Sequence, residues 1–216
     1  MYMTHSHVAE PIVYIIDDDQ DICNSLKWLL DSVQLETRTF NSATEFLTYE
    51  RPNTPACLIL DIRMRGMSGL QLQQQLNQQR INIPVIFMTG HGDIPMSVNA
   101  MKAGAFDFLE KPFNPQHMLN QIQACLQQAE QNFIASEQRK QQMQKLESLS
   151  PRENEIIKLM VDGLSSKHIA QMLNISHKTV EIHRTHIRQK LGTESIAQMV
   201  NMVLMCRDKT MQAMVY

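Results

Sequence analysis

Hydrophobic and polar positions divide residues 1–124 into short apolar runs and segments with helical spacing. A continuous apolar run suits a strand that is buried on both faces, whereas apolar residues three or four positions apart indicate an amphipathic helix. The pattern predicts strands at residues 13–16, 36–40, 57–60, 84–88 and 106–109. A helix is predicted after each strand, at about 22–33, from 43, at 70–79, at 96–103 and after 113. This alternation predicts an α/β fold, a doubly wound five-stranded parallel sheet with helices on both faces.

The rest of the chain has helical patterns only. Residues 125–148 contain no glycine or proline and many Gln, Glu and Lys residues, which favours a continuation of the last helix into a polar linker. Gln-rich disorder is the alternative for this segment. Beyond it the pattern predicts a small all-α unit with helices at about 151–162, 166–173, 176–191 and 195–205. The second and third of these helices, with a short turn between them, have the proportions of a helix-turn-helix.

Charge separates the two halves of the chain. The net charge of −2 combines −5 over residues 1–124 with +3 over residues 149–216, which suggests two domains with different partners. The four cysteines are scattered and form no CxxC pair, so we expect reduced thiols and no zinc site. The apolar runs are too short to cross a membrane, and the N-terminus lacks the pattern of a secretory signal. We therefore expect a cytoplasmic protein with no membrane partner.

Polar residues follow the predicted strands at one edge of the sheet. Asp17 and Asp18 follow the first strand, Asp61 the third, Thr89 the fourth and Lys111 the fifth. Taken singly, each has a simpler interpretation, as a helix cap, a turn residue or a surface lysine. Taken together they lie where doubly wound sheets bind ligands, and clustered carboxylates favour a hard cation such as Mg²⁺. The set predicts phosphoryl chemistry, in which a carboxylate attacks phosphorus while the metal, the ammonium and the hydroxyl stabilise the oxygens.

The residues around these positions resemble the receiver domain of bacterial two-component response regulators. The resemblance rests on IIDDD, LILDIRMRGMSGL and VIFMTGHGDIPMSVNAMKAGAFDFLEKPF and covers residues 11–130. Residues 89–113 are especially similar to the FixJ subgroup. The resemblance implies a flavodoxin-like fold with Asp61 as the phosphoacceptor. It also implies Mg²⁺ bound by Asp18, Asp61 and the backbone carbonyl of Arg63, with Asp17 acting mainly through water.

The same resemblance implies a switch. Thr89 matches the family's switch hydroxyl, Phe108 its aromatic rotamer switch and Lys111 its lysine, which precedes a cis bond to proline. Arg65 departs from the pattern, because this loop usually carries proline there. That change bears on loop rigidity or the dephosphorylation rate, although it removes no phosphoryl ligand.

The helix predicted at 176–191 has two distinct faces. Val180, Ile187 and Leu191 form an apolar stripe that should pack on other helices. The opposite face is polar with basic flanks, which fits insertion into a major groove, where Glu181 could accept from cytosine and Ile182 touch a thymine methyl. We expect DNA contacts from Lys178, Thr179, Glu181, Ile182, His183, Arg184, Thr185, Arg188 and Lys190. The alternatives are an ordinary solvated helix and, for His183, a packing role.

Residues 149–210 resemble the LuxR/FixJ-type DNA-binding domain. The resemblance rests on LSPRENEIIKLMVDGLSSKHIAQMLNISHKTVEIHRTHIRQKLG and leaves residues 131–148 as the linker. Asn174 stands where the family often has glycine, a mild change because Asn tolerates a left-handed turn. In the family the last helix mediates dimerisation. The candidates for its apolar surface are Met199, Met202, Val203 and Met205.

The leading hypothesis is a phosphorylation-switched transcription factor that is not an enzyme. A sensor histidine kinase would phosphorylate Asp61 in the presence of Mg²⁺, and the modified protein would form a homodimer on double-stranded promoter DNA. RNA polymerase is a further candidate partner. A Mg²⁺-dependent phosphatase of the haloacid-dehalogenase type is a rival, but Arg63 stands where that class has a general acid. A DNA-binding protein with a receiver that plays no part is disfavoured by the complete pocket.

Overall fold

The computed structural model describes residues 10–90, 94–195 and 197–204, with the side chains of 94–97 left out. These residues fall into two compact units, 1–134 and 135–216, which are described separately. Within the described ranges, no helix combines the length and the hydropathy that a membrane crossing requires. Met205 and Cys206 lie outside the described residues.

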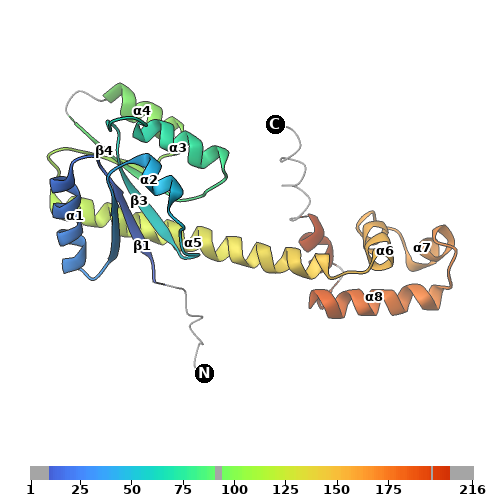
Figure 1. Ribbon diagram of the computed structural model, residues 1–216. Helices are drawn as coiled ribbons and strands as arrows, with labels where there is room; N and C mark the ends of the chain where they lie inside the picture. The colour runs from blue at the N-terminus through green and yellow to red at the C-terminus, as the bar shows by residue number, and fades with distance from the viewer. Residues whose placement is uncertain (1–9, 91–93, 196, 205–216) are drawn as a thin grey trace. The chain divides into compact units, whose positions relative to one another are not determined.

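The first unit is built on a five-stranded parallel sheet in the order β2-β1-β3-β4-β5 (Figure 1). The strands are β1 (Ile12–Ile16), β2 (Glu36–Phe40), β3 (Ala56–Asp61), β4 (Val85–Thr89) and β5 (Asp107–Glu110). The helices are α1 (Gln20–Ser32), α2 (Ala43–Thr48), α3 (Gly69–Gln78), α4 (Ile94–Lys102) and α5 (Pro115–Glu147). The predicted doubly wound α/β fold is confirmed.

The sheet is covered on both faces, which explains why its central strands are apolar throughout. All five residues of β1 are buried. Tyr14 and its even-numbered neighbours contact one core with α2 and α3, while Val13 and Ile15 contact the other with α1 and α5. Successive side chains of a strand point to opposite faces, so a strand buried on both sides needs apolar residues at every position. Each fully buried Ile or Leu contributes roughly 1.5–3 kcal/mol.

Helix α5 is much longer than the others, at 33 residues. Its first part belongs to the core of the first unit through Met118, Ile122 and Leu126. It continues without a break to Glu147, because residues 125–147 contain neither glycine nor proline to end it. The segment 131–147 is therefore helical.

The second unit is helical, with α6 (Pro151–Val161), α7 (Ser166–Met172), α8 (His177–Leu191) and a further helical stretch at 197–204. Its helices begin at serine caps, and Ser150 forms a full capping box with Glu153. Asn174 adopts the left-handed conformation, with φ 51°, which asparagine tolerates. The core draws on every helix and includes Ile156, Ile169 and Ile187.

The apolar surface expected on the last helical stretch is not formed as predicted. Met199 and Val203 are buried in the core of the second unit, and Met202 packs against it. The spacing of these residues indicates one apolar face, but a sequence alone does not tell whether such a face meets its own domain or a partner. Leu204 is the large apolar side chain that this stretch exposes among the described residues.

Candidate functional site

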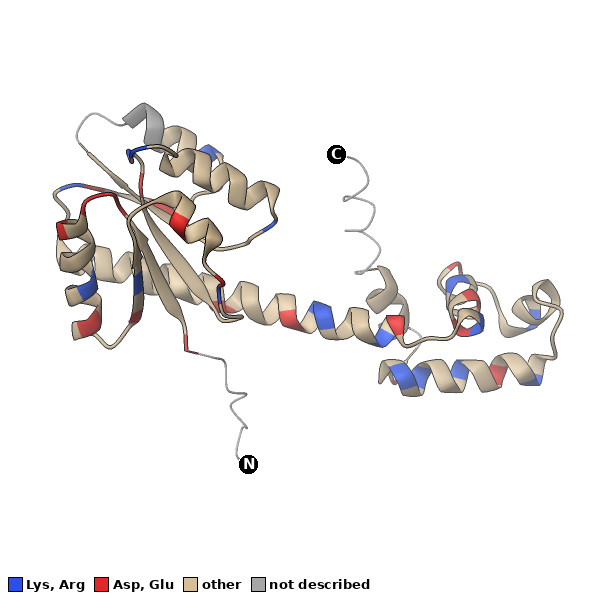
Figure 2. Cartoon of the chain, in the orientation of Figure 1, with Lys and Arg blue, Asp and Glu red and all other residues tan. Residues whose placement is uncertain are grey.

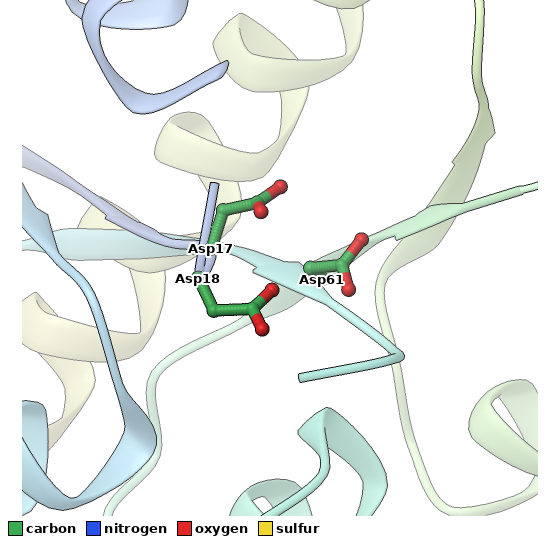
Figure 3. A group of neighbouring side chains, drawn as sticks. All are labelled: Asp17, Asp18 and Asp61. Atoms are coloured by element: carbon green, nitrogen blue, oxygen red, sulfur yellow. The ribbon is translucent and has the colours of Figure 1, made fainter. Parts of the chain in front are cut away.

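Three carboxylates meet at the carboxyl edge of the sheet. Asp17 and Asp18 follow β1, and Asp61 is the last residue of β3. Figure 3 shows their side chains close together at the ends of the strands, and one ligand oxygen from each lies within 4.8 Å of the others. Asp17 and Asp61 are buried, Asp18 is exposed, and all three line a cleft of about 340 Å³. The strand ends thus bring together residues that are up to 44 positions apart.

The turn after β1 gives each of its three aspartates a different task. Asp19 is the cap of α1, where its side chain accepts from the backbone N–H groups of Asp21 and Ile22. Asp17 Oδ1 accepts the N–H of Asp19 at 2.9 Å. Asp18, between them, is left facing the cleft. The capping role considered for Asp17 therefore belongs to Asp19.

Lys111 links the two buried carboxylates. Its Nζ donates to Asp17 Oδ2 at 2.8 Å and to Asp61 Oδ1 at 2.7 Å. Burial by itself would lower the pKa of Lys111, but the hydrogen bonds to these two carboxylates raise it above its usual value. The ammonium is therefore firmly charged. The peptide bond that follows it, Lys111–Pro112, is cis, as predicted.

Asp61 is held at both of its oxygens. Oδ1 accepts from Lys111, and Oδ2 accepts the backbone N–H of Arg63 at 2.8 Å. Burial raises the pKa of Asp61, while the hydrogen bond from Lys111 opposes this rise and the nearby Asp17 carboxylate adds to it. Gly69, at the start of α3, packs directly on the end of β3, and a β-carbon there would collide with the carbonyl oxygen of Asp61.

The donor set suits a small hard cation. Three carboxylates with one compensating ammonium leave an excess of negative charge, and carboxylate oxygens are the ligands that Mg²⁺ prefers. Asp18 and Asp61 each offer a carboxylate oxygen, and these two oxygens lie within 4.8 Å of each other. Arg63, which follows Asp61 by two positions, also lines the cleft. These residues fit the expected magnesium site.

Arg65 adds a contact that sequence reasoning did not anticipate. Its backbone N–H donates to Asp18 Oδ2 at 3.2 Å, and its Nε lies 3.7 Å from the same oxygen. The sequence did single out Arg65 as a departure from proline. Nothing in the sequence indicates that Arg65, in the loop after β3, contacts Asp18, which lies 47 positions earlier in the loop after β1.

The two expected switch residues lie on β4 and β5. Thr89, the last residue of β4, is buried, and its hydroxyl is 3.5 Å from the carbonyl oxygen of Leu109. Met88 and Gly90 line the cleft, whereas Thr89 is not among its described lining residues. Phe108, on β5, is 43% exposed. The structure therefore brings Asp17, Asp18, Asp61 and Lys111 together in the cleft, and it places Thr89 on the adjacent strand, next to the residue paired with Asp61.

Helix α8 has the two faces that its sequence predicts. Val180, Ile187 and Leu191 are completely buried in the core of the second unit. Ile182 is 47% exposed although it is strongly apolar. Lysines and arginines recur along this helix (Figure 2). The exposed members of the predicted DNA-binding set are Lys178, Ile182, Thr185, Arg188 and Lys190.

Two basic residues of that set also have partners inside the domain. Arg184 is largely buried, and its Nη1 contacts Ser166 Oγ and lies 3.2 Å from Glu181 Oε1. Hydrogen bonding to Ser166 and the charge of Arg184 lower the pKa of Glu181. These contacts tie α8 to the first residue of α7. No periodicity in the sequence signals Ser166 as their partner.

Lys190 also forms hydrogen bonds within the second unit. Its Nζ donates to Glu153 Oε2 at 2.7 Å and to the carbonyl of Ser148 at 3.3 Å. Glu153, buried in the capping box of α6, was recognisable as a cap but not as the partner of a lysine on α8. His183 is partly buried, and its Nδ1 has no hydrogen-bond partner among the described residues. Its partial burial fits the packing alternative.

Comparison with known proteins gives a family to each unit. Residues 13–123 match the family described as "Response regulator receiver domain", and residues 147–203 match "Bacterial regulatory proteins, luxR family". Transcriptional regulatory protein TdiR of Thauera aromatica is 42% identical over 192 residues, which cover 89% of this chain and 85% of that protein. Transcriptional regulatory protein FixJ of Azorhizobium caulinodans is 38% identical over 193 residues, covering 89% and 92%.

Solved structures of response regulators are also similar to this chain. The response regulator StyR matches with a TM-score of 0.79 at 45% identity, over 90% of this chain and 98% of that one. Full-length FixJ from B. japonicum matches with a TM-score of 0.53 at 34% identity, over 89% and 95%. The fold and the acidic cleft thus define a receiver domain, joined in one chain to a helical domain of the LuxR type. The chain belongs to the response regulators that combine these two domains, the family of transcriptional regulatory proteins that includes FixJ.

Proposed function

We propose that Asp61 accepts a phosphoryl group from a sensor histidine kinase. The observation that carries this proposal is the cleft itself, where Asp61 Oδ1 lies 2.7 Å from Lys111 Nζ and within reach of the Asp18 carboxylate. A carboxylate oxygen of Asp61 would attack phosphorus, forming an O–P bond as the bond to the donor histidine breaks. Thr89 and Phe108 are the proposed switch residues that respond to the new group.

Each residue of the cleft has a part in this transfer. Lys111 neutralises charge on the phosphoryl oxygens, and its strong protonation keeps that charge in place throughout. Asp18, Asp61 and the carbonyl of Arg63 would hold Mg²⁺, with Asp17 acting through water. The ion, when bound, offsets the repulsion between the carboxylates and the incoming phosphoryl oxygens. The N–H of Arg63 keeps the Asp61 carboxylate oriented.

The second part of the proposal concerns DNA. Residues 11–130 would act as the receiver, 131–148 as the linker and 149–210 as the domain that binds promoter DNA as a homodimer after phosphorylation. The exposure of Ile182 and Thr185 and the partial exposure of Glu181 support base reading by these three residues. RNA polymerase remains a candidate partner, and a regulator that binds promoter DNA would work in the cytoplasm as a non-enzymatic switch.

Intact-mass measurement tests the phosphoacceptor. With Mg²⁺ and acetyl phosphate, the wild-type chain should gain the mass of one phosphoryl group, labile to base, and Asp61→Asn should gain none. Asp31→Asn, an exposed carboxylate on α1, is the matched control and should label as the wild type does. Asp18→Ala should lose the labelling that depends on Mg²⁺, because a direct metal ligand is removed. Full labelling of Asp61→Asn would show that another residue is the phosphoacceptor.

A further inference from the structure

The loop after β3 reaches Asp18 through one residue. Arg65 offers Asp18 Oδ2 two donors, the backbone N–H at 3.2 Å and the guanidinium Nε at 3.7 Å. Asp18 is the most exposed of the three carboxylates in the cleft. The loop therefore supplies it with a hydrogen bond and a positive charge from outside the buried Asp17–Lys111–Asp61 group.

Both donors depend on the identity of this residue. Proline has no backbone N–H and no charge, so a proline at position 65 would offer Asp18 neither interaction. Any other uncharged residue would keep the N–H and lose the charge. Arginine is thus a residue type that supplies both at once.

We propose that Arg65 is a positioning residue that holds the Asp18 carboxylate and thereby weakens its binding of Mg²⁺. This inference rests on the proposed function, in which Asp18 is a metal ligand. Arg65 acts through Asp18 and has no part in the attack on phosphorus. It sets the Mg²⁺ concentration at which the cleft fills.

The charges in the cleft give the direction of the effect. Three carboxylates and Lys111 carry a formal charge of −2, and the guanidinium of Arg65 reduces it to −1. A divalent cation is attracted less strongly to the second arrangement, and it must also share Asp18 with the two donors of Arg65. Removing these donors should therefore tighten the binding of Mg²⁺.

Exposure of the guanidinium limits the size of the effect and makes it sensitive to salt. The Arg65 side chain is 98% exposed, and ion pairs in such positions are worth little, corresponding to about a two- to fivefold change in affinity. Salt screens exposed charges over about 10 Å at 0.1 M ionic strength and more strongly above that. A purely structural role for Arg65 would not depend on salt in this way.

The test is a titration of the full-length protein with Mn²⁺ and Mg²⁺. Free Mn²⁺ is followed by electron paramagnetic resonance, and Mg²⁺ is then added as a competitor, so the readout is metal affinity without phosphorylation. Arg65→Ala removes the guanidinium, Arg65→Pro removes the N–H as well, and Arg65→Lys keeps a positive charge and the N–H. Arg80→Ala, which removes an exposed charge just beyond the far end of α3, is the matched control.

At low salt, Arg65→Ala should bind Mg²⁺ about two- to fivefold more tightly than the wild type, and this ratio should approach one as salt is raised. Arg65→Pro should bind at least as tightly as Arg65→Ala, whereas Arg65→Lys and Arg80→Ala should match the wild type. Equal or weaker binding by Arg65→Ala, or a ratio that salt leaves unchanged, would overturn the inference. Weaker binding by Arg65→Pro than by Arg65→Ala would overturn the part assigned to the N–H.

Asp18→Ala separates a failure of this inference from a failure of the proposed site. If Asp18→Ala binds Mg²⁺ as the wild type does, Asp18 is not a ligand and the metal site itself is wrong. If Asp18→Ala loses Mg²⁺ binding while the Arg65 variants bind Mg²⁺ as the wild type does, the metal site is supported and the role proposed for Arg65 is wrong.

Discussion

Two arginines on α8 lie beside the same buried stripe and have different surroundings. Arg184 is largely buried against Ser166 and Glu181, whereas Arg188 is exposed to solvent. An exposed arginine next to a DNA-reading face is placed to meet phosphates, but an arginine already bound to a neighbouring helix acts first on protein geometry. Both arginines were expected to contact DNA, and a phosphate contact is therefore best assigned to Arg188.

Replacing Arg188 and Glu181 should have different effects on DNA binding. Arg188→Ala should weaken binding to cognate and scrambled duplexes alike and flatten the salt slope by roughly one unit, because a phosphate contact is independent of sequence. Glu181→Ala should cost about 1–3 kcal/mol on the cognate duplex and little on the scrambled one. Binding isotherms for phosphorylated protein at two salt concentrations measure both effects.

Gln189→Ala, which changes an exposed neighbour of Arg188 without altering charge, is the control for this pair of variants. If Glu181→Ala weakens both duplexes equally while Arg188→Ala changes base preference, the two residues have exchanged roles and the helix is rotated in the groove.

At the scale of elements, one ion pair connects the start of α6 to the end of α8. Glu153 is buried; its carboxylate accepts from Lys190 and from the N–H of Ser150, and its own backbone N–H donates to Ser150 Oγ. Burial raises the pKa of Glu153, but the hydrogen bonds from Lys190 and Ser150 outweigh it and lower the pKa from 4.5 to about 2. A carboxyl group whose pKa falls on folding stabilises the folded state wherever it is ionised.

The stability of the second unit should therefore decline in acid. The contribution of Glu153 is complete above its unfolded pKa of 4.5 and is lost as the pH falls through about 2. Glu153→Gln should destabilise α6 and α8 by about 2–3 kcal/mol at neutral pH and by progressively less below pH 4.5. Amide hydrogen exchange of these helices at several pH values measures the change locally.

Glu155→Gln is the matched control for this prediction, because Glu155 is an exposed residue of the same helix that pairs with Arg152. It should change protection only slightly. Equal losses for the two variants at every pH would mean that the buried pair with Lys190 contributes nothing specific.

The elements of this fold were largely predictable, and the reason is physical. Strands buried on both faces, such as β1 and β3, must be apolar at every position, and that leaves a clear pattern in the sequence. The strand ends then locate Asp17, Asp18, Asp61 and Lys111 on one edge. Contacts between loops leave no such pattern, so the approach of Arg65 to Asp18 could not be predicted. The prediction that Met199 belongs to a dimerisation surface was wrong for a related reason. Periodicity in the sequence shows that a helix has an apolar face, but it does not show what that face packs against.

Thr89 is the residue through which phosphorylation of Asp61 could affect the rest of the molecule. The Thr89 hydroxyl faces the carbonyl of Leu109 on the neighbouring strand β5, which also carries the exposed Phe108. To contact a phosphoryl group on Asp61, this hydroxyl would have to exchange its present acceptor for a new one. Such an exchange would couple the cleft to β5.

Thr89→Ala should therefore accept phosphate and yet lose most of the gain in dimerisation and DNA affinity that phosphorylation brings. The variant lacks the hydroxyl that senses the new oxygens, but it retains Asp61 and Lys111. Intact mass reports the modification, and sedimentation velocity with and without acetyl phosphate reports the assembly. Thr89→Ser keeps a hydroxyl and should restore the response. Normal dimerisation of fully phosphorylated Thr89→Ala would exclude Thr89 as the coupling residue.

The close packing of Gly69 against the end of β3 has a consequence for how this protein tolerates mutation. Any side chain at position 69 would push on the carbonyl oxygen of Asp61, so even alanine would displace the strand end that carries the proposed phosphoacceptor. A substitution at Gly69 would then disturb the site although glycine performs no chemistry. A search for functional positions that considers only reactive side chains would overlook Gly69, because this residue matters through its lack of a side chain.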